Sequence, residues 1–274
     1  RQRDTLSAPA QCHPARRQRG AGRPPTQKVE GGTLVHDVTQ VVSGLSTQTL
    51  GAAAGGSAVA AGPVVTVEAQ DGGAVLENDL VKAVIGADGT IHSLFDKRVS
   101  REALSDRANQ LWAYMDRPRA WDAWDIDETY DTIGEEITTV DHIEIVEEGP
   151  LRAAVRVTRS WRTSRFTQTY RLLADSARLD VVGEVDWHER LVLVRALFPT
   201  TIHAHEATFE TMFGVQRRSN NRNTSWDRAK FEVGAHRFVD LSEPHYGVAL
   251  LNDSKYGFSG HGGTLGISLV RGPL

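Results

Sequence analysis

The sequence predicts an all-β protein built as an antiparallel β-sandwich, and three observations support this fold class. From residue 75 onward, runs of alternating apolar and polar residues follow one another, which is the pattern of half-buried strands. Turn residues separate these runs at intervals of about 8–12 residues. Only one short segment has helical character, so consecutive strands are expected to pair as antiparallel neighbours and to stack in layers.

Residues 1–30 are expected to form a disordered basic leader. They are rich in Arg, Pro, Gln and Gly and show no periodicity. Seven Lys or Arg stand against two Asp or Glu, a net charge of +5, which leaves −9 for the rest of the chain. A nucleic-acid-binding arm is the functional alternative, but the leader contains no aromatic residue. We therefore expect no nucleic-acid partner.

Residues 31–74 are interpreted as a short β segment with a flexible linker. Two β-branched runs, at 33–42 and 62–70, flank the stretch GAAAGGSAVAAG. Residues 75–97 then alternate apolar and polar positions around an Ala-Asp-Gly turn at 87–89, which predicts a hairpin. Residues 100–111 are the best helical candidate in the chain.

Residues 142–189 predict at least four strands of a β-sandwich domain that covers 75–274. Turns are expected at Gly149-Pro150 and Ala174-Asp175. Arginines recur along these strands and are expected to face outward, which would leave one face of the sheet solvated; they are Arg152, Arg156 and Arg159.

Composition limits the classes of partner. The chain has 274 residues, 40% of them hydrophobic, which is enough for one large core or two modest ones. A net charge of −4 favours neither nucleic acid nor an anionic membrane. No apolar run approaches the roughly 20 residues of a membrane span. The single cysteine, Cys12, allows no internal disulfide and no cysteine-based zinc site. With no apolar signal segment at the start, we expect a cytoplasmic protein without a membrane partner.

Two polar, tryptophan-bearing segments are the candidates for a site. In the first, Trp121 and Trp124 alternate with Asp122, Asp125 and Asp127. One interpretation is a surface loop whose aromatic rings are tucked into the core. The other is a sugar subsite, in which indoles stack on a pyranose and carboxylates accept hydrogen bonds from its hydroxyls. Paired carboxylates are also typical of glycosidase catalysis, although spacing alone does not bring them together.

In the second segment, Arg222 lies between Asn221 and Asn223, and Trp226 and Asp227 follow. The structural interpretation is a loop whose Asn and Asp side chains satisfy turn backbone and which Trp226 anchors. The functional interpretation is that Arg222 or Asp227 points toward the active site of a neighbouring domain. Elsewhere, His203 and His205 would face the same way on a strand, as two metal ligands could, although two imidazoles on a solvated strand face are commoner than a metal site.

Several long motifs carry a family resemblance. They are LENDLVKAVIGADGTIHSLFDKRVSRE, WDAWDID, EVDWHERLVLVRALFP, FGVQRRSNNRNTSWDRAKFEVGAHRFVDLSEPHYGVALLNDSKYG and LGISLVRGP. In this order they resemble the C-terminal β region of glycoside hydrolase family 38 α-mannosidases, in the branch found in bacteria and in the eukaryotic cytosol and vacuole. The resemblance covers about residues 75–274, with a weaker likeness over 29–74. It implies a galactose-mutarotase-like supersandwich.

The resemblance also implies where the chemistry resides. These enzymes are retaining glycosidases with an aspartate nucleophile, an aspartate acid/base and a zinc ion, all in an N-terminal catalytic domain and the helical bundle after it. No position of this chain matches those residues, so no catalytic residue, metal ligand or cofactor is carried over, and zinc is expected in the full-length parent enzyme. The chain is thus expected to be a fragment that begins after the catalytic domain, ends before the last strands and is inactive alone.

The motifs WDAWD and NRNTSWD imply contacts at the rim of the active site with a mannose-containing oligosaccharide or glycoside, next to the missing catalytic domain. The implied rim residues are Trp121, Asp122, Trp124, Asp125, Arg222, Asn223, Trp226 and Asp227. The preceding RRSN departs from the Pro and His of relatives, which places a contact at 219–221 in doubt. Two alternatives stay open: a free-standing carbohydrate-binding β-sandwich, and a mutarotase-like epimerase that would recruit His188, His203, His236 and Glu210.

Overall fold

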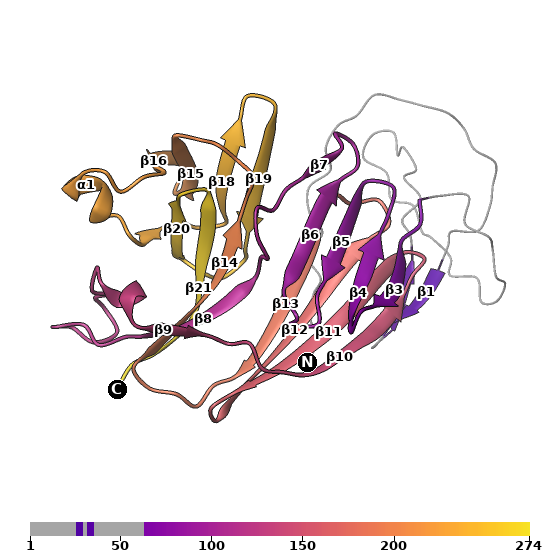
Figure 1. The fold of residues 1–274 in the computed structure, drawn as a ribbon, viewed down its shortest axis with the longest axis horizontal. Helices are drawn as coiled ribbons and strands as arrows, with labels where there is room; N and C mark the ends of the chain where they lie inside the picture. The colour runs from indigo at the N-terminus through magenta and orange to yellow at the C-terminus, as the bar shows by residue number, and fades with distance from the viewer. Residues whose placement is uncertain (1–25, 30–31, 36–62) are drawn as a thin grey trace, which may run out of the picture.

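The computed structural model describes residues 26–29, 32–35 and 63–274. These residues form 21 strands, one four-residue α-helix and one 3-10 turn, and every strand pair among them is antiparallel. The predicted all-β, antiparallel class is therefore confirmed. The strands are divided among four larger sheets, rather than the two of a simple sandwich, and a small hairpin (Figure 1).

Two of the sheets are simple meanders that face each other (Figure 1). The first contains β3 (Thr66–Gln70), β4 (Gly73–Glu77), β5 (Val81–Ile85), β6 (Ile91–Asp96) and β7 (Arg101–Glu102). The second contains β10 (Val140–Glu148), β11 (Arg152–Trp161), β12 (Ser164–Leu173) and β13 (Leu179–Asp186). One buried cluster joins them, with Leu76 and Ile85 from the first sheet and Val155 and Leu172 from the second. Burial of these apolar side chains holds the two sheets together.

The other two sheets are less regular because they combine distant segments. A six-stranded sheet has the order β17 (Val233–Gly234), β20 (Gly257–His261), β21 (Thr264–Gly272), β14 (Val192–Pro199), β8 (Gln110–Met115) and β9 (Gly134–Glu136). A four-stranded sheet has the order β16 (Gly214–Ser219), β15 (Glu206–Thr211), β18 (Phe238–Glu243) and β19 (Tyr246–Leu251). The short elements are α1 (Ser225–Arg228), η1 (Tyr130–Thr132) and the hairpin of β1 (Thr26–Val29) and β2 (Gly32–Val35).

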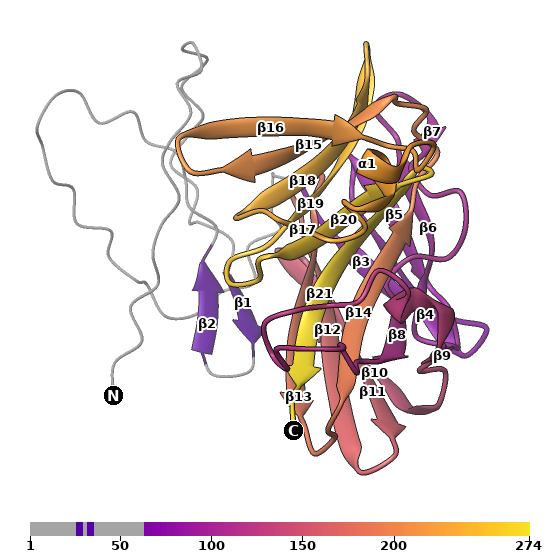
Figure 2. The ribbon, with the colours of Figure 1, turned by 90° about the vertical axis from the view of Figure 1, so that its left-hand side faces the viewer.

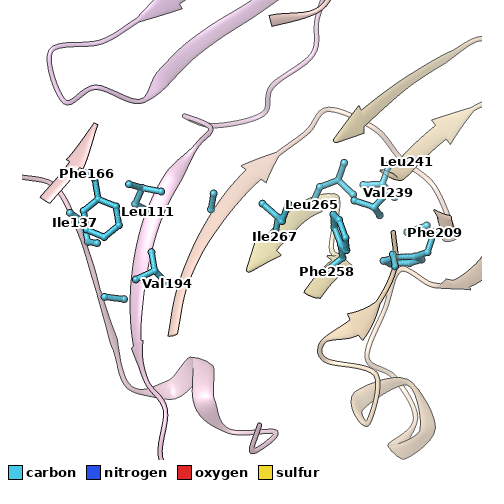
Figure 3. Packing of buried hydrophobic residues seen from close by; sticks show 14 of the residues in the cluster. Leu111, Ile137, Phe166, Val194, Phe209, Val239, Leu241, Phe258, Leu265 and Ile267 are labelled. Carbon is cyan, nitrogen blue, oxygen red and sulfur yellow. The ribbon is translucent and has the colours of Figure 1, made fainter. Parts of the chain in front are cut away.

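The six-stranded sheet is central to the second hydrophobic core (Figure 3). Phe258 and Leu265 pack with Phe209 and Val239 of the neighbouring four-stranded sheet. At the other end of the same cluster, Leu111, Ile137 and Val194 pack with Phe166 of β12. Figure 2 shows the β15–β16 hairpin extending to one side, with Phe213 fully exposed at its tip.

The local turn signals are confirmed. β5 and β6 form the predicted hairpin, whose turn is held by Asp88: its carboxylate accepts hydrogen bonds from the Thr90 backbone N–H at 3.0 Å and hydroxyl at 2.8 Å. The predicted turns at Gly149-Pro150 and Ala174-Asp175 join β10 to β11 and β12 to β13. Each of these pairings connects strands adjacent in sequence, which is why local patterns were enough to predict them.

The predicted helix at 100–111 is wrong. The segment contains β7, an extended connection and the first residues of β8. Its apolar residues face the core between strands: the Ala108 and Ile91 backbones exchange hydrogen bonds of 2.8 and 2.9 Å, and Leu104 bridges to Thr200. The Glu102 carboxylate accepts a bond from the Leu94 backbone N–H at 2.9 Å, which fixes β7 at the sheet edge. Tertiary contacts outweigh the weak helical preference of the segment.

The outward orientation predicted for three arginines is wrong for Arg159. Its side chain is buried and donates hydrogen bonds to Gln168 Oε1 at 2.6 Å and to the Asp88 backbone oxygen at 2.9 Å. Side chains alternate along a strand with period two, so position 159 faces opposite to 152 and 156. The guanidinium therefore satisfies polar groups between the two meander sheets.

The predicted disordered leader, residues 1–30, lies outside the described residues except for 26–29, which form β1 instead. Gln27 is buried against β11: its amide oxygen accepts the backbone N–H of Leu151 at 2.8 Å and that of Arg152 at 2.7 Å. Of the predicted run at 33–42 only the part in β2 is described, and the GAAAGGSAVAAG linker lies outside the described residues. No helix among the described residues is long and apolar enough to cross a membrane.

Candidate functional site

Two loops carry the predicted rim residues, and the structure brings them together. The first, residues 116–133, leaves β8 and returns through η1 to β9. The second, residues 220–232, follows β16, contains α1 and leads to β17. Both lie on the same side of the molecule, at the left of Figure 1. An ion pair joins them, with Arg222 Nη1 3.2 Å from Asp131 Oδ2.

The indoles of both loops are exposed. The exposed fraction is 77% for Trp121, 91% for Trp124 and 79% for Trp226. The interpretation in which aromatic rings are tucked into the core or anchor the second loop is therefore wrong for these three residues. Trp121 and Trp124 line one shallow depression together with Asp125. Among the described residues, the three indoles make no ring contact with one another.

The first loop has a tightly folded tip. Trp121 and Ala123 have left-handed backbone, with φ of +59° and +68°. The Trp121 carbonyl accepts hydrogen bonds from the backbone N–H groups of Trp124 at 2.8 Å and Asp125 at 3.0 Å. Left-handed backbone is unfavourable for residues with a Cβ and tends to cluster at binding sites. Both indoles of this turn are exposed to solvent.

A buried ion pair fixes the base of this loop to the sheet. Asp116, which follows β8, is 2% exposed and accepts two hydrogen bonds from Arg271 of β21, the one to Oδ1 at 3.0 Å. Arg271 also donates to the backbone oxygen of Asp125. A two-point contact between guanidinium and carboxylate is strong and directional. Arg271 therefore attaches both the start of the loop, at Asp116, and the residue after Trp124, Asp125, to the same strand, β21.

Arg195 of β14 is the residue on which both loops converge. It is 3% exposed and donates to the Tyr130 hydroxyl of the first loop and to Ser259 Oγ at 2.7 Å. Its Nε lies 3.8 Å from Oε2 of Glu232, at the end of the second loop. Glu232 Oε1 accepts from Ser268 Oγ at 2.5 Å. This cluster was not predicted from the sequence, where the available signal was a single charged residue inside the apolar run VLVRALF.

Two glycines make room for the buried charges. A Cβ at Gly266 would lie 2.9 Å from Arg195 Nη2, and one at Gly257 would lie 2.3 Å from Glu232 Oε1. Burial raises the pKa of the Tyr114 hydroxyl, which stands beside this cluster, to about 12. Burial also raises the pKa of Tyr130. Both phenols are thus neutral at physiological pH, and Tyr130 can serve Arg195 as a neutral acceptor.

The structural interpretation holds for Asp227. Its carboxylate accepts the Thr224 backbone N–H at 3.3 Å while its own backbone N–H donates to Thr224 Oγ1 at 3.1 Å, a capping box at the start of α1. The hydrogen bond from Thr224 lowers the pKa of Asp227. The backbone N–H of Asn223 donates to Asn221 Oδ1 at 3.1 Å, so these residues shape the loop. In the second segment, the exposed Trp226 remains for a ligand, whereas the guanidinium of Arg222 is already paired with Asp131.

The histidines do not assemble into a site. His203 and His205 lie in the loop before β15 rather than on a strand. Within the described part of the chain, no three His, Cys, Asp or Glu side chains are close enough to hold a metal ion. The four residues of the epimerase alternative do not form one site. His188 pairs with Asp186, and the His203 backbone N–H donates to Glu243. His236 and Glu210 are joined only through their backbones, and the Glu210 carboxylate accepts the Arg237 backbone N–H at 2.6 Å.

Comparison with known proteins identifies the family. Residues 76–274 match the family described as "Glycosyl hydrolases family 38 C-terminal domain". The chain belongs to this family. It is 37% identical over 222 residues to "Alpha-mannosidase G" of Dictyostelium discoideum, a match that covers 77% of this chain and 20% of the relative. It is also 37% identical over 215 residues to "Alpha-mannosidase 2C1" of Homo sapiens, covering 77% of this chain and 21% of that protein.

The chain thus spans about a fifth of the length of the curated family 38 relatives that it matches. Among solved structures, an alpha-mannosidase from Enterococcus faecalis V583 has the same fold, with a TM-score of 0.63 and 16% identity. That match covers 76% of this chain and 27% of the bacterial protein. The family 38 resemblance of the sequence motifs is confirmed.

Proposed function

We propose that the chain is the C-terminal β portion of a zinc-dependent retaining α-mannosidase and that its two tethered loops form one edge of the mannoside-binding cleft. The family match over residues 76–274, to proteins named alpha-mannosidases of which it covers a fifth, is the observation that supports this most. The nucleophile, the acid/base and the zinc ligands belong to the part of the parent that precedes the match. The proposal includes a galactose-mutarotase-like supersandwich and a cytoplasmic location.

Zinc does not fit the described residues of this chain, because they offer no converging set of three metal ligands. The proposal therefore assigns the chain no step of bond cleavage. Its contribution is to bind and orient the glycoside. Exposed indoles such as Trp121 and Trp124 suit the apolar face of a pyranose. The contacts of Arg195 and Arg271 hold the loops in place before the ligand arrives, which reduces the entropy cost of binding.

The proposal is tested first on the purified chain. With zinc and 4-nitrophenyl α-mannoside, we expect no turnover, and measurable turnover would overturn the assignment of the chemistry to the rest of the parent. The complementary experiment, in which activity is expected, uses a chimera. In it, residues 63–274 of this chain replace the matching region of the Dictyostelium enzyme. We expect the chimera to hydrolyse the same substrate. A folded chimera without activity would contradict the proposed place of this chain in the enzyme.

Rim contact is tested in the same chimera. The double substitution Trp121→Ala/Trp124→Ala should raise KM about tenfold, since stacking contributes roughly 0.5–1.5 kcal/mol per aromatic pair. Phe213→Ala removes a fully exposed ring outside the two loops and should leave KM unchanged. If both variants behave alike, the loops do not contact the sugar.

The second candidate is a free-standing carbohydrate-binding module. The depression formed by Trp121, Trp124 and Asp125 favours it, because it exists in this chain without further residues. Calorimetric titration of the purified chain with mannobiose separates the two candidates. Half of a cleft should bind negligibly, whereas a binding module should saturate at millimolar sugar or below.

A further inference from the structure

A pocket separate from the exposed indoles lies at the base of the first loop. It is a cavity of about 260 Å³, close to the lower limit of roughly 300 Å³ for small-molecule sites. Its apolar surface comes from both ends of the loop and from two neighbouring connections, and includes Met115, Ile133, Trp161 and Leu191. The volume suits one or two fused rings rather than a peptide segment.

Three arginines and one carboxylate, Glu135, line the same pocket, and the arginines differ in their partners. Arg162 pairs with Glu135 at 3.0 Å, and its guanidinium lies 4.2 Å from the centre of the Trp161 ring. Arg117 and Arg190 have no hydrogen-bond or ion-pair partner within the described part of the chain. Two guanidinium groups beside an apolar floor form a surface for a molecule with a negative charge at one end and an apolar body.

The walls of the pocket are fixed by backbone. Leu191 has left-handed backbone, with φ of +55°, and its carbonyl accepts the Asp116 N–H at 2.9 Å. Arg162 is also left-handed, with φ of +52°, in the turn between β11 and β12. A Cβ at Gly134 would lie 2.4 Å from the Tyr114 ring, so this wall requires glycine. Left-handed residues with side chains tend to gather at ligand sites.

We infer that this pocket binds a small organic carboxylate, with its apolar body against Trp161 and Leu191 and its carboxylate between Arg117 and Arg190. The charge complementarity and the cavity size carry the inference, which does not depend on the proposed mannoside site. A neutral ligand of the same shape would leave both guanidinium groups without an anionic partner. The site therefore selects for charge as well as for apolar area.

The test uses 2-naphthoate and its neutral analogue 2-naphthamide in calorimetric titrations of the purified chain. We expect saturable binding of the carboxylate and binding of the amide that is about tenfold weaker, since each exposed ion pair contributes up to about 1 kcal/mol. The double variant Arg117→Gln/Arg190→Gln should weaken 2-naphthoate by a similar factor. Arg165→Gln, an exposed arginine of β12 outside the pocket, should change nothing.

Because Arg117 and Arg190 are exposed, their replacement should not affect folding, and an unchanged thermal midpoint verifies this. The inference is overturned if 2-naphthoate does not bind, if the amide binds equally well, or if binding survives the double substitution. An equal loss with Arg165→Gln would show that only the overall charge matters, and would overturn it as well.

Discussion

Replacement of Arg195 by methionine should be among the most destabilising single changes in the protein. The side chains of Arg195 and Glu232 are only 4% and 8% exposed, with Nε and Oε2 3.8 Å apart. Arg195→Met leaves the Glu232 carboxylate buried with the Ser268 hydroxyl but without its cation. Removing one partner of a buried ion pair costs about 3–5 kcal/mol because the other charge stays buried.

A second substitution separates lost charge balance from lost packing. In Arg195→Met/Glu232→Gln the uncompensated carboxylate is gone, while the glutamine oxygen can still accept from Ser268. We therefore expect the double variant to be more stable than Arg195→Met alone, with a coupling energy of at least about 1 kcal/mol. Arg165→Met, on the exposed face of β12, is the matched control and should lie within about 0.5 kcal/mol of the parent.

The assay is urea unfolding followed by circular dichroism, with acrylamide quenching of tryptophan fluorescence as a local readout. Tyr130 and Glu232 hold the two loops to Arg195. The acrylamide quenching of Arg195→Met should therefore differ from that of the parent already at urea concentrations below the unfolding transition. The reasoning is refuted if Arg195→Met costs less than about 1 kcal/mol, or if Glu232→Gln adds its own cost instead of relieving the first.

Three further predictions concern local contacts. Thr224→Ala removes the N-cap of α1, and the Asp227 amide should exchange hydrogen about fivefold faster by NMR, as expected for a loss of about 1 kcal/mol; an unchanged rate would contradict the capping box. Hydrogen bonds from Arg101 lower the pKa of Glu243 from 4.5 to about 2, so this contact stabilises above pH 4.5 and is lost as pH falls toward 2. Between pH 5 and pH 2.5, the Tm of Glu243→Gln should then fall by less than the Tm of the parent. Profiles of Tm against pH that are parallel for the two proteins would refute this prediction. Gly266→Ala forces a Cβ within 2.9 Å of Arg195 Nη2 and should cost about 1–3 kcal/mol in urea unfolding, whereas wild-type stability would show that the strand shifts freely.

The fold could be predicted from the sequence wherever structure is local. β10 to β13 pair in sequence order and are joined by tight turns, so period-two patterns and turn residues identify them. The order of the six-stranded sheet could not be predicted in this way. In it, β14 pairs with β8 and with β21, which are both distant from β14 in sequence. The burial of Arg159 could have been predicted from the sequence. Residues 156 and 159 are three positions apart, so on a regular strand their side chains point to opposite faces of the sheet.

The candidate site shows the same division. The two candidate segments could be selected from their motifs, but the contacts that join them could not be predicted. Arg222 and Asp131 are 91 residues apart, and Arg195 is 65 residues from Tyr130. No local pattern specifies such pairs, because only the order of strands in the sheet brings them together. The sequence did contain one clue, since a charged residue within a buried strand requires partners from elsewhere in the chain.

The positions of the exposed indoles are therefore properties of the six-stranded sheet as much as of the loops. Arg271 of β21 and Arg195 of β14 stand on neighbouring strands, and each contacts a residue of the first loop. Arg195 also faces Glu232 at the end of the second loop. A change that shifts β14 relative to β21 would therefore displace the anchoring contacts of both loops. We therefore expect ligand affinity at the proposed Trp121 and Trp124 site to respond to substitutions in the core of this sheet, at positions outside that site.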